Sequence, residues 1–250
     1  MKRLEKKDYK DFLATLADES VDCFITDPAY WTLDKWREIG TTTRLGGHSK
    51  AEERDEDKWF KTIDSNDLWV LMNEMWRVLK PNTHAYIFCD HETLRYVLSY
   101  ADDMEWRKAK PLIWDKVNPG MGYTYRCRHE FIVFLEKGKR QLHDLSIPDI
   151  LAVKKIIGGY PTEKPVALME ILIKQSSVEG DLVCDPFFGS GSVAVACENL
   201  SRRFTGCDIS EKAHEYLRSR MGQQNLLTFT RESVEVYNPC CHRDRKENQV

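Results

Sequence analysis

Residues 181–200 read DLVCDPFFGSGSVAVACENL, and this stretch decides the fold. A short apolar run ends at Asp185, glycines follow at positions 189 and 191, and a mostly apolar segment continues to Leu200. A buried strand, a glycine turn and a helix in this order are typical of the ligand-binding unit of parallel α/β sheets. The stretch therefore predicts an α/β fold, with a mostly parallel sheet and helices on both faces.

The charge beside the glycine turn narrows the class of ligand. Gly189 and Gly191 match the dinucleotide fingerprint, and Asp208 ends the next predicted strand, where its carboxylate can accept hydrogen bonds from a ribose. A dinucleotide would place its pyrophosphate at this turn, however, and the carboxylate of Asp185 would repel it. S-adenosylmethionine fits better, because it carries a sulfonium and an ammonium and no phosphate. A nicotinamide-dependent dehydrogenase remains the alternative.

Strand-like and helix-like segments alternate on both sides of this unit. We expect one catalytic domain over residues 1–237 and a solvated tail over 238–250. Helices are predicted over 8–17, 65–79, 91–103, 164–176 and 211–221, and strands over 21–26, 84–90, 111–116, 130–138 and 202–210.

Composition indicates a soluble protein. Of 250 residues, 42% are hydrophobic and 31% are charged, and no apolar stretch approaches the roughly 18 residues of a membrane span. The first residues, MKRLEKKDYKDF, have no apolar core of a signal peptide, so we expect a cytoplasmic protein without membrane partners. The eight cysteines form no C-x-x-C pair, so we expect no metal site.

A second stretch, FITDPAYW at 24–31, predicts the reaction. Asp-Pro begins many ordinary turns, so this stretch alone is ambiguous. TDPAY (26–30) resembles the D-P-P-Y catalytic motif of the DNA amino-methyltransferases, and DPFFGSGS (185–192) resembles their cofactor motif. YPTEKPVALME (160–170) resembles the H-P-T-x-K-P segment that precedes the cofactor motif. With the catalytic motif first, the order is similar to the circularly permuted β-type members of this family.

The resemblance implies a Rossmann-like methyltransferase fold and transfer of a methyl group from S-adenosylmethionine to N6 of a flipped-out adenine. It implies that the Asp27 carboxylate and the Pro28 carbonyl accept hydrogen bonds from the amine, and that Tyr30 stacks on the base. Ala29 stands where the family's second proline is expected. The implied cofactor-binding residues are Asp8, Thr162, Lys164, Asp185, Phe187, Gly189, Gly191, Ser192 and Asp208.

The resemblance leaves two alternatives within the family. Cytosine-N4 enzymes more often carry serine at the position of Asp27, so aspartate favours adenine. A homologue that binds DNA without turnover is the other alternative, because Ala29 loosens the catalytic turn. Double-stranded DNA is the expected partner, and a homodimer and a cognate restriction nuclease are further expectations.

Basic residues indicate where DNA would bind. Residues 107–140 hold nine Lys/Arg and three acidic residues, whereas the whole chain has a net charge of −3. Two weakly patterned segments, 32–62 and 137–159, are candidate DNA-recognition insertions. The candidate DNA-contacting residues are Thr42, Arg44, His48, Arg126, Arg128, Lys139 and Arg140.

Overall fold

The computed structural model describes residues 2–33, 61–120, 125–160 and 162–224. Within these ranges, eight strands form one sheet in the order β1-β8-β7-β2-β3-β5-β4-β6. The strands are β1 (Lys2–Glu5), β2 (Val21–Thr26), β3 (Leu79–Cys89), β4 (Lys108–Asp115), β5 (His129–Lys137), β6 (Ile150–Ala152), β7 (Leu182–Asp185) and β8 (Arg203–Cys207). Of these strands only β5 runs antiparallel to its neighbours.

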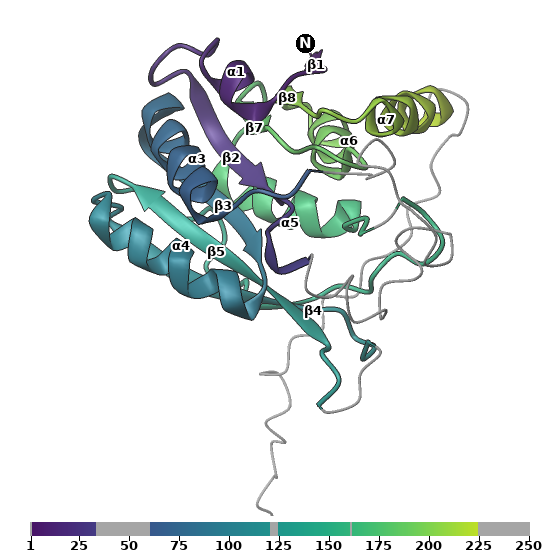
Figure 1. The fold of residues 1–250 in the computed structure, drawn as a ribbon, viewed down its shortest axis with the longest axis horizontal. Helices are drawn as coiled ribbons and strands as arrows, with labels where there is room; N and C mark the ends of the chain where they lie inside the picture. Colours follow the sequence, from purple (N-terminus) through teal and green to yellow (C-terminus); the bar gives the residue numbers. More distant parts are fainter. Residues whose placement is uncertain (1, 34–60, 121–124, 161, 225–250) are drawn as a thin grey trace, which may run out of the picture.

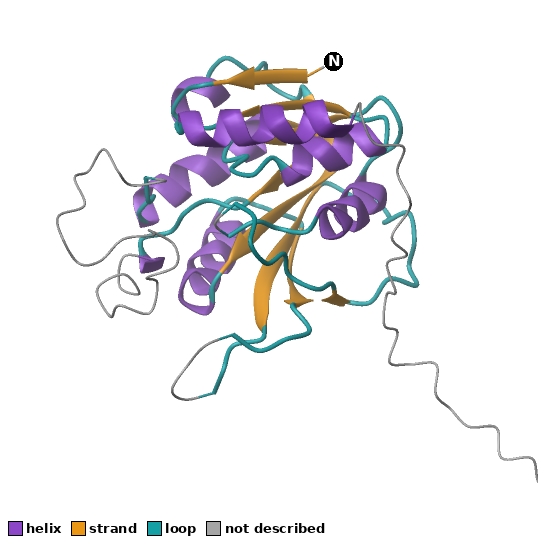
Figure 2. Ribbon diagram, turned by 90° about the vertical axis from the view of Figure 1, so that its right-hand side faces the viewer, coloured by secondary structure: helices purple, strands orange, loops and turns teal. Residues whose placement is uncertain are grey.

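Helices cover both faces of the sheet (Figures 1 and 2). The apolar side chains of β2 alternate, so that Phe24 belongs to one hydrophobic core while Cys23 and Ile25 belong to the other. The first core includes α1 (Tyr9–Leu13), α3 (Ser65–Val78) and α4 (His91–Asp103), and the second includes α5 (Val166–Ser176), α6 (Ser192–Asn199) and α7 (Glu211–Gln224). This arrangement confirms the predicted fold class.

Aspartates at the ends of strands and loops begin three of these helices. The side chain of Asp8 accepts a hydrogen bond from the backbone N–H of Lys10 at 3.1 Å and caps α1. Asp64 forms a capping box with Asp67 at the start of α3, and Asp90 caps α4. The helices therefore begin close to the carboxyl end of the sheet, where the pocket lies.

The sequence patterns place most elements within a few residues, with four corrections. The predicted helix 8–17 is reduced to the five residues of α1. The strand predicted from residue 84 begins at Leu79, so that Pro81 lies within it. The strands β1 and β6 were not predicted, because β1 is mostly charged and β6 has only three residues. Both lie at edges of the sheet, where no alternating apolar pattern is required.

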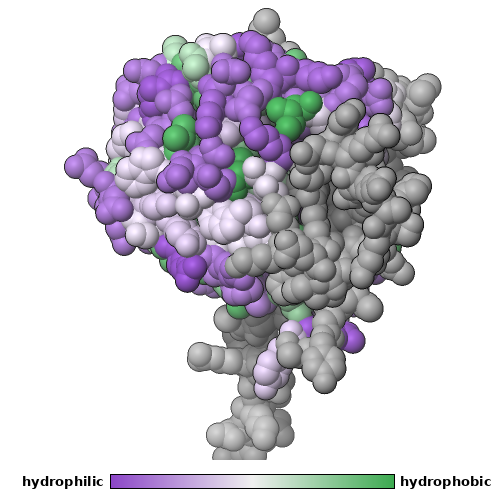
Figure 3. All heavy atoms as spheres, viewed as in Figure 1, coloured by the Kyte–Doolittle hydropathy of each residue, from purple (hydrophilic) through white to green (hydrophobic). Residues whose placement is uncertain are grey.

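The surface agrees with the composition. Figure 3 shows hydrophilic residues over most of the described surface on this face, with small separate hydrophobic patches. Within the described ranges, none of the helices is both long and apolar enough to cross a membrane. The tail predicted over 238–250 and most of the first insertion lie outside the described residues.

The strand order reverses direction between β2 and β7, which is where α/β sheets usually bind ligands. These strands are parallel neighbours, with Cys23 opposite Val183 and Phe24 opposite Cys184. From β2 the chain continues to β3 on one side, and from β7 it continues to β8 on the other. The strand order therefore diverges between β2 and β7, and α/β sheets bind ligands at the carboxyl ends of strands at such a switch point.

Gly191 supports this turn through packing. It has φ +76°, and a Cβ atom there would lie 2.3 Å from Cδ1 of Leu217, which is fully buried in α7. We expect Gly191→Ala to lower the free energy of unfolding by about 2–4 kcal/mol, because it combines a left-handed backbone with a clash. Gly180 is the matched control: it has φ +84° and open space around its Cα, so Gly180→Ala should cost about 1 kcal/mol. Equal losses in urea unfolding would contradict the role of the Leu217 contact.

Candidate active site

The segment that follows β2 holds the predicted catalytic residues in a fixed turn. The Tyr30 hydroxyl donates a hydrogen bond to the backbone carbonyl of Phe88 at 2.8 Å, and the Tyr30 side chain is almost completely buried. The Ile63 N–H donates to the Ala29 carbonyl at 2.7 Å, and Trp31 N–H donates to the Ile63 carbonyl at 3.1 Å. The turn is therefore anchored to β3 and to the segment before α3.

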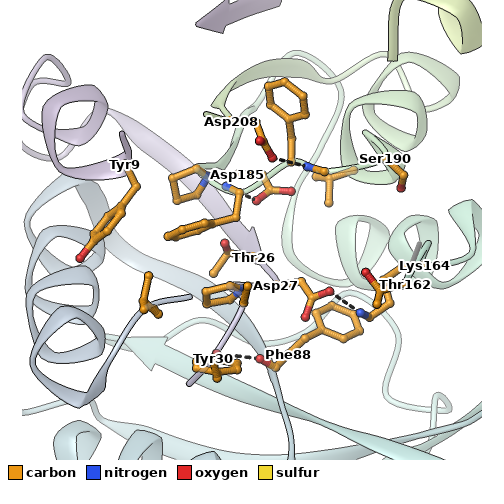
Figure 4. Close-up of a pocket in the computed structure, with 18 of the residues that line it drawn as sticks. Tyr9, Thr26, Asp27, Tyr30, Phe88, Thr162, Lys164, Asp185, Ser190 and Asp208 are labelled. Atoms are coloured by element: carbon orange, nitrogen blue, oxygen red, sulfur yellow. Dashed lines mark hydrogen bonds and ion pairs between the residues drawn. The ribbon is translucent and has the colours of Figure 1, made fainter. Parts of the chain in front are cut away.

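A pocket of about 240 Å³ lies at the carboxyl ends of β2 and β7. It brings together Asp8, Asp27, Asp185 and Asp208, which belong to four separate segments of the chain. In the close-up, Asp185 lies between Asp208 and Asp27 (Figure 4). Of the predicted catalytic and cofactor-binding residues, all line this pocket except Gly191, whose contact is with α7.

Two carboxylates bind the backbone of the glycine turn. Asp208 accepts hydrogen bonds from Gly189 N–H at 3.0 Å and from Ser210 N–H at 2.8 Å. Asp185 accepts one from Phe187 N–H at 3.1 Å. Burial raises the pKa of Asp185 to about 8, and burial also raises the pKa of Asp208. A cationic ligand would favour the ionised form of these buried carboxyl groups, so the turn suits a cation.

Aromatic rings form one wall of this pocket. The ring of Phe187 lies 5.0 Å from that of Tyr9, between centroids, with an angle of 36° between the planes. The Tyr9 hydroxyl donates to the backbone carbonyl of Asp67 at 3.1 Å, which fixes its ring against α3. The sequence patterns identified Phe187 and did not single out Tyr9, which has no motif of its own.

Lys164 contacts the predicted catalytic carboxylate, Asp27. Its buried ammonium group forms an ion pair with Asp27 Oδ2 and a second one, at 3.4 Å, with Glu130 Oε2 (Figure 4 shows the first). It also lies 5.3 Å from the centroid of the Phe88 ring. Lys164 was expected to bind the cofactor, whereas its ammonium contacts Asp27 and its backbone carbonyl accepts a hydrogen bond from the Ser192 hydroxyl at 2.6 Å.

Glu163 is connected to α7 and, through Arg220, to the glycine turn. The Tyr216 hydroxyl donates to Glu163 Oε2 at 2.8 Å, and Arg220 pairs with Glu163 Oε1 at 3.1 Å. Arg220 also donates to the backbone carbonyl of Ser190 at 2.8 Å and to the Ser192 hydroxyl at 3.2 Å. Thr162 lines the pocket beside this network. Sequence reasoning missed Glu163 and Arg220, because their partners are brought together by α7.

The structure separates the candidate DNA-contacting residues into two groups. Arg126 and Arg128 precede β5 and lie at the edge of the sheet that carries the pocket, where Arg128 pairs with Asp115 at 2.5 Å. Lys139 and Arg140 follow β5 and lie at the end of the strands that is far from the pocket, because β5 runs antiparallel to β3. The nine residues of β5 span about 27 Å. Lys139 and Arg140 are therefore far from the pocket.

Three candidates, Thr42, Arg44 and His48, lie outside the described residues. The second insertion, 137–159, contains β6, which pairs with β4 and returns the chain toward the pocket edge. This insertion thus begins at the end of the strands that is far from the pocket, and it ends near the pocket.

Comparisons with known proteins agree with this geometry. The family model described as DNA methylase, N6_N4_Mtase, matches residues 21–157 and 146–219. Type II methyltransferase M.HhaII of Haemophilus parahaemolyticus is 29% identical over 213 residues, which cover 80% of this chain and 87% of that protein. Type II methyltransferase M2.DpnII of Streptococcus pneumoniae is 26% identical over 242 residues, covering 86% and 87%.

Solved structures share the fold. The complex of M1.HpyAVI with SAM has a TM-score of 0.64 and 22% identity, and it covers 88% of this chain and 100% of that chain. The cytosine-N4-specific PvuII DNA methyltransferase has a TM-score of 0.65 and 15% identity, covering 88% and 86%. Since the family match runs from strand β2 into helix α7 and includes the pocket-lining residues that follow β2 and β7, the chain belongs to the N6_N4_Mtase family of DNA methylases.

Proposed function

We propose that this protein transfers a methyl group from S-adenosylmethionine to the N6 amine of adenine in double-stranded DNA. The observation that carries the proposal is the placement of Asp27 and Asp185 at the ends of neighbouring strands, in one pocket. One carboxylate belongs to the catalytic motif and the other to the cofactor motif. The reacting amine and the methyl donor would therefore meet between β2 and β7.

The residues of the glycine turn fit S-adenosylmethionine. The backbone N–H groups of Phe187 and Gly189, which would bind a pyrophosphate, instead donate to Asp185 and Asp208. Those carboxylates can attract the ammonium group of the cofactor and accept hydrogen bonds from its ribose, and Tyr9 and Phe187 offer apolar surface to the adenine ring. The same occupied N–H groups argue against a nicotinamide dinucleotide.

When bound, S-adenosylmethionine supplies a methyl group activated by its sulfonium. The bond between the amine nitrogen and the methyl carbon would form as the carbon–sulfur bond breaks, and sulfur would keep the bonding pair and leave as a neutral thioether. The amine would lose one proton to water. Asp27 would accept a hydrogen bond from one amine hydrogen and the Pro28 carbonyl from the other, which directs the nitrogen lone pair toward the methyl group. The anchored Tyr30 would stack on the flipped base.

Adenine is proposed over cytosine because residue 27 is an aspartate. The chemistry at N4 of cytosine is nearly the same, and the PvuII enzyme, which shares the fold, is cytosine-N4-specific. Cytosine-N4 transfer is therefore the second candidate. A cytoplasmic location is a further proposal, supported by the type II methyltransferases of bacteria among the relatives. A homodimer and a cognate nuclease are also proposed.

The decisive experiment identifies the methylated base. Purified protein is incubated with labelled S-adenosylmethionine and bacterial genomic DNA, and the DNA is digested to nucleosides and separated. We expect label in N6-methyladenine. Label in N4-methylcytosine would support the second candidate, and RNA of the same sequence serves as the control for substrate class.

Absence of transfer to any DNA or RNA, with cofactor binding retained, would support the DNA-binding homologue. In that case Ala29→Pro should raise activity, because proline restores the expected rigidity of the catalytic turn.

A further inference from the structure

Four charged side chains of alternating sign form a row that ends at the catalytic carboxylate. Lys116 Nζ lies 2.5 Å from Glu130 Oε1, and Glu130 Oε2 lies 3.4 Å from Lys164 Nζ. Lys164 in turn pairs with Asp27. The four residues come from the end of β4, the start of β5, the segment before α5 and the turn after β2. They are neighbours because β4 and β5 pair with each other and β5 pairs with β3.

The row is partly shielded from solvent and lies among aromatic rings. The side chain of Lys164 is 9% exposed, and those of Lys116, Glu130 and Asp27 are 21%, 31% and 35% exposed. Lys116 Nζ lies 5.3 Å from the centroid of the Trp114 ring, and Lys164 Nζ lies 6.0 Å from the same centroid. Charges in such a setting interact more strongly than at a fully exposed surface, because water screens them less.

The ammonium of Lys164 is shared by two carboxylates, and only one of them belongs to the catalytic motif. We propose that Glu130 and Lys116 are positioning residues that control how strongly Lys164 holds Asp27: Glu130 draws the ammonium away, and Lys116 compensates Glu130. This inference rests on the proposed function, in which Asp27 accepts a hydrogen bond from the target amine and is the stronger acceptor when it is ionised. Asp27 has two oxygens, so it can hold Lys164 with one and the amine with the other.

The charges that face Asp27 determine whether each substitution raises or lowers its pKa. Burial raises the pKa of Asp27, while Lys164 and Lys116 lower it and Glu130 raises it. Asp185 on β7, Cys89 at the end of β3 and Tyr30 in the same turn also interact with Asp27. Removing Lys116 should therefore raise the pKa of Asp27, and neutralising Glu130 should lower it. If Lys116 and Glu130 had only a structural role, their substitution would not shift the pKa of Asp27 in opposite directions.

The test uses two variants, Lys116→Met and Glu130→Gln, with saturating cofactor and DNA. The single-turnover rate of methyl transfer is measured between pH 4.5 and 9. We expect the acidic limb of the profile to move to higher pH in Lys116→Met and to lower pH in Glu130→Gln, each by about 0.5 to 1 unit. Lys116→Arg should restore the wild-type limb.

Lys110→Met is the matched control, because Lys110 lies on the same strand and pairs with Asp149 at 2.9 Å on the exposed edge. It should leave the profile unchanged. Limbs that move in the same direction, or that do not move in either variant, would overturn the inference. Should Lys116→Met fail to fold, Glu130→Gln and Lys116→Arg still test it.

A second readout does not depend on catalysis. The titration of the Asp27 carboxyl carbon is followed by ¹³C NMR in the protein without DNA, in wild type and both variants. Opposite shifts of its midpoint support the inference even when the wild type transfers no methyl group, a result that would refute only the proposed function. Unchanged midpoints together with an active wild type would refute only the inference.

Discussion

Asp27→Ala is expected to lower the rate of methyl transfer to DNA about 10³-fold, the loss that accompanies removal of one hydrogen-bonding group aimed at a reacting centre. The amine would lose the acceptor that directs its lone pair. The Lys164 ammonium, deprived of Asp27, would also keep only the weaker partner Glu130, at 3.4 Å, so its positive charge beside the methyl donor would be less compensated. Single-turnover kinetics with saturating cofactor measure the loss directly.

The same variant should keep most of its affinity for S-adenosylmethionine, because Asp185 and Asp208 remain in place. Calorimetric titration checks this, and a lost affinity would assign Asp27 to the cofactor site instead. Asp18→Ala is the matched control. Asp18 lies just before β2, at the end opposite to Asp27, and also pairs with a basic side chain, Arg77 at 2.5 Å, but its own side chain is 74% exposed. An exposed pair contributes little, so this control should retain nearly full activity.

Asp185→Asn is expected to weaken the binding of S-adenosylmethionine about 100-fold at pH 8, since a carboxylate facing the ammonium group becomes neutral. The asparagine carbonyl can still accept the hydrogen bond from Phe187 N–H, so the turn should remain folded. Asp181→Asn, at the amino end of the same strand, is the matched control and should bind normally. Calorimetry of all three proteins provides the measurement.

The affinity for S-adenosylmethionine should also depend on pH, in a direction that the pKa of Asp185 determines. Because the pKa of Asp185 is raised to about 8 by burial, the free protein carries it mostly protonated at pH 6. A cationic ligand favours the carboxylate, so binding releases a proton and affinity should rise by up to about tenfold per unit between pH 6 and 7.5. The profile of Asp185→Asn should be flatter over the same range. Parallel profiles would exclude Asp185 as the group that responds to the ligand.

The stability of the free protein should fall as the pH rises, whereas its affinity for the cofactor should increase. The folded-state pKa of Asp185 lies above the ordinary value for aspartate, so its favourable contribution is complete at acidic pH and is lost as the pH rises through about 8. Without ligand, Asp185→Asn should therefore have a higher Tm than the wild type at pH 8. Such a gain in stability with a loss of binding is typical of a carboxylate kept buried for function.

The turns after β2 and β7, for which catalysis and cofactor binding are proposed, could be predicted without a structure because each is a local pattern. An apolar strand, an Asp-Pro step and closely spaced glycines are set by neighbouring residues, so TDPAY and DPFFGSGS were informative as written. Their combination also predicted the sheet class, which the strand order confirms. The charged edge strand β1 and the short strand β6 have no comparable signal.

The candidate DNA-contacting residues show where local patterns fail. Arg128 and Lys139 looked equivalent as basic residues near one strand. They lie at opposite ends of β5, and Arg128 is the one at the pocket end because β5 runs antiparallel to β3. A strand's direction is set by its pairing partner and not by its own residues. Contact with DNA at the pocket edge is therefore proposed for the hairpin that carries Arg126 and Arg128.

The sequence by itself determined the α/β class, the two turns and the acidic character of the cofactor site, because strand, turn and helix signals act over a few residues. Only the tertiary structure decided that Lys164 pairs with Asp27, and that Glu130 and Lys116 extend this pair into a row of four charges. These contacts join residues far apart along the chain. They depend on which strands are neighbours and in which direction each one runs, a property of the whole sheet.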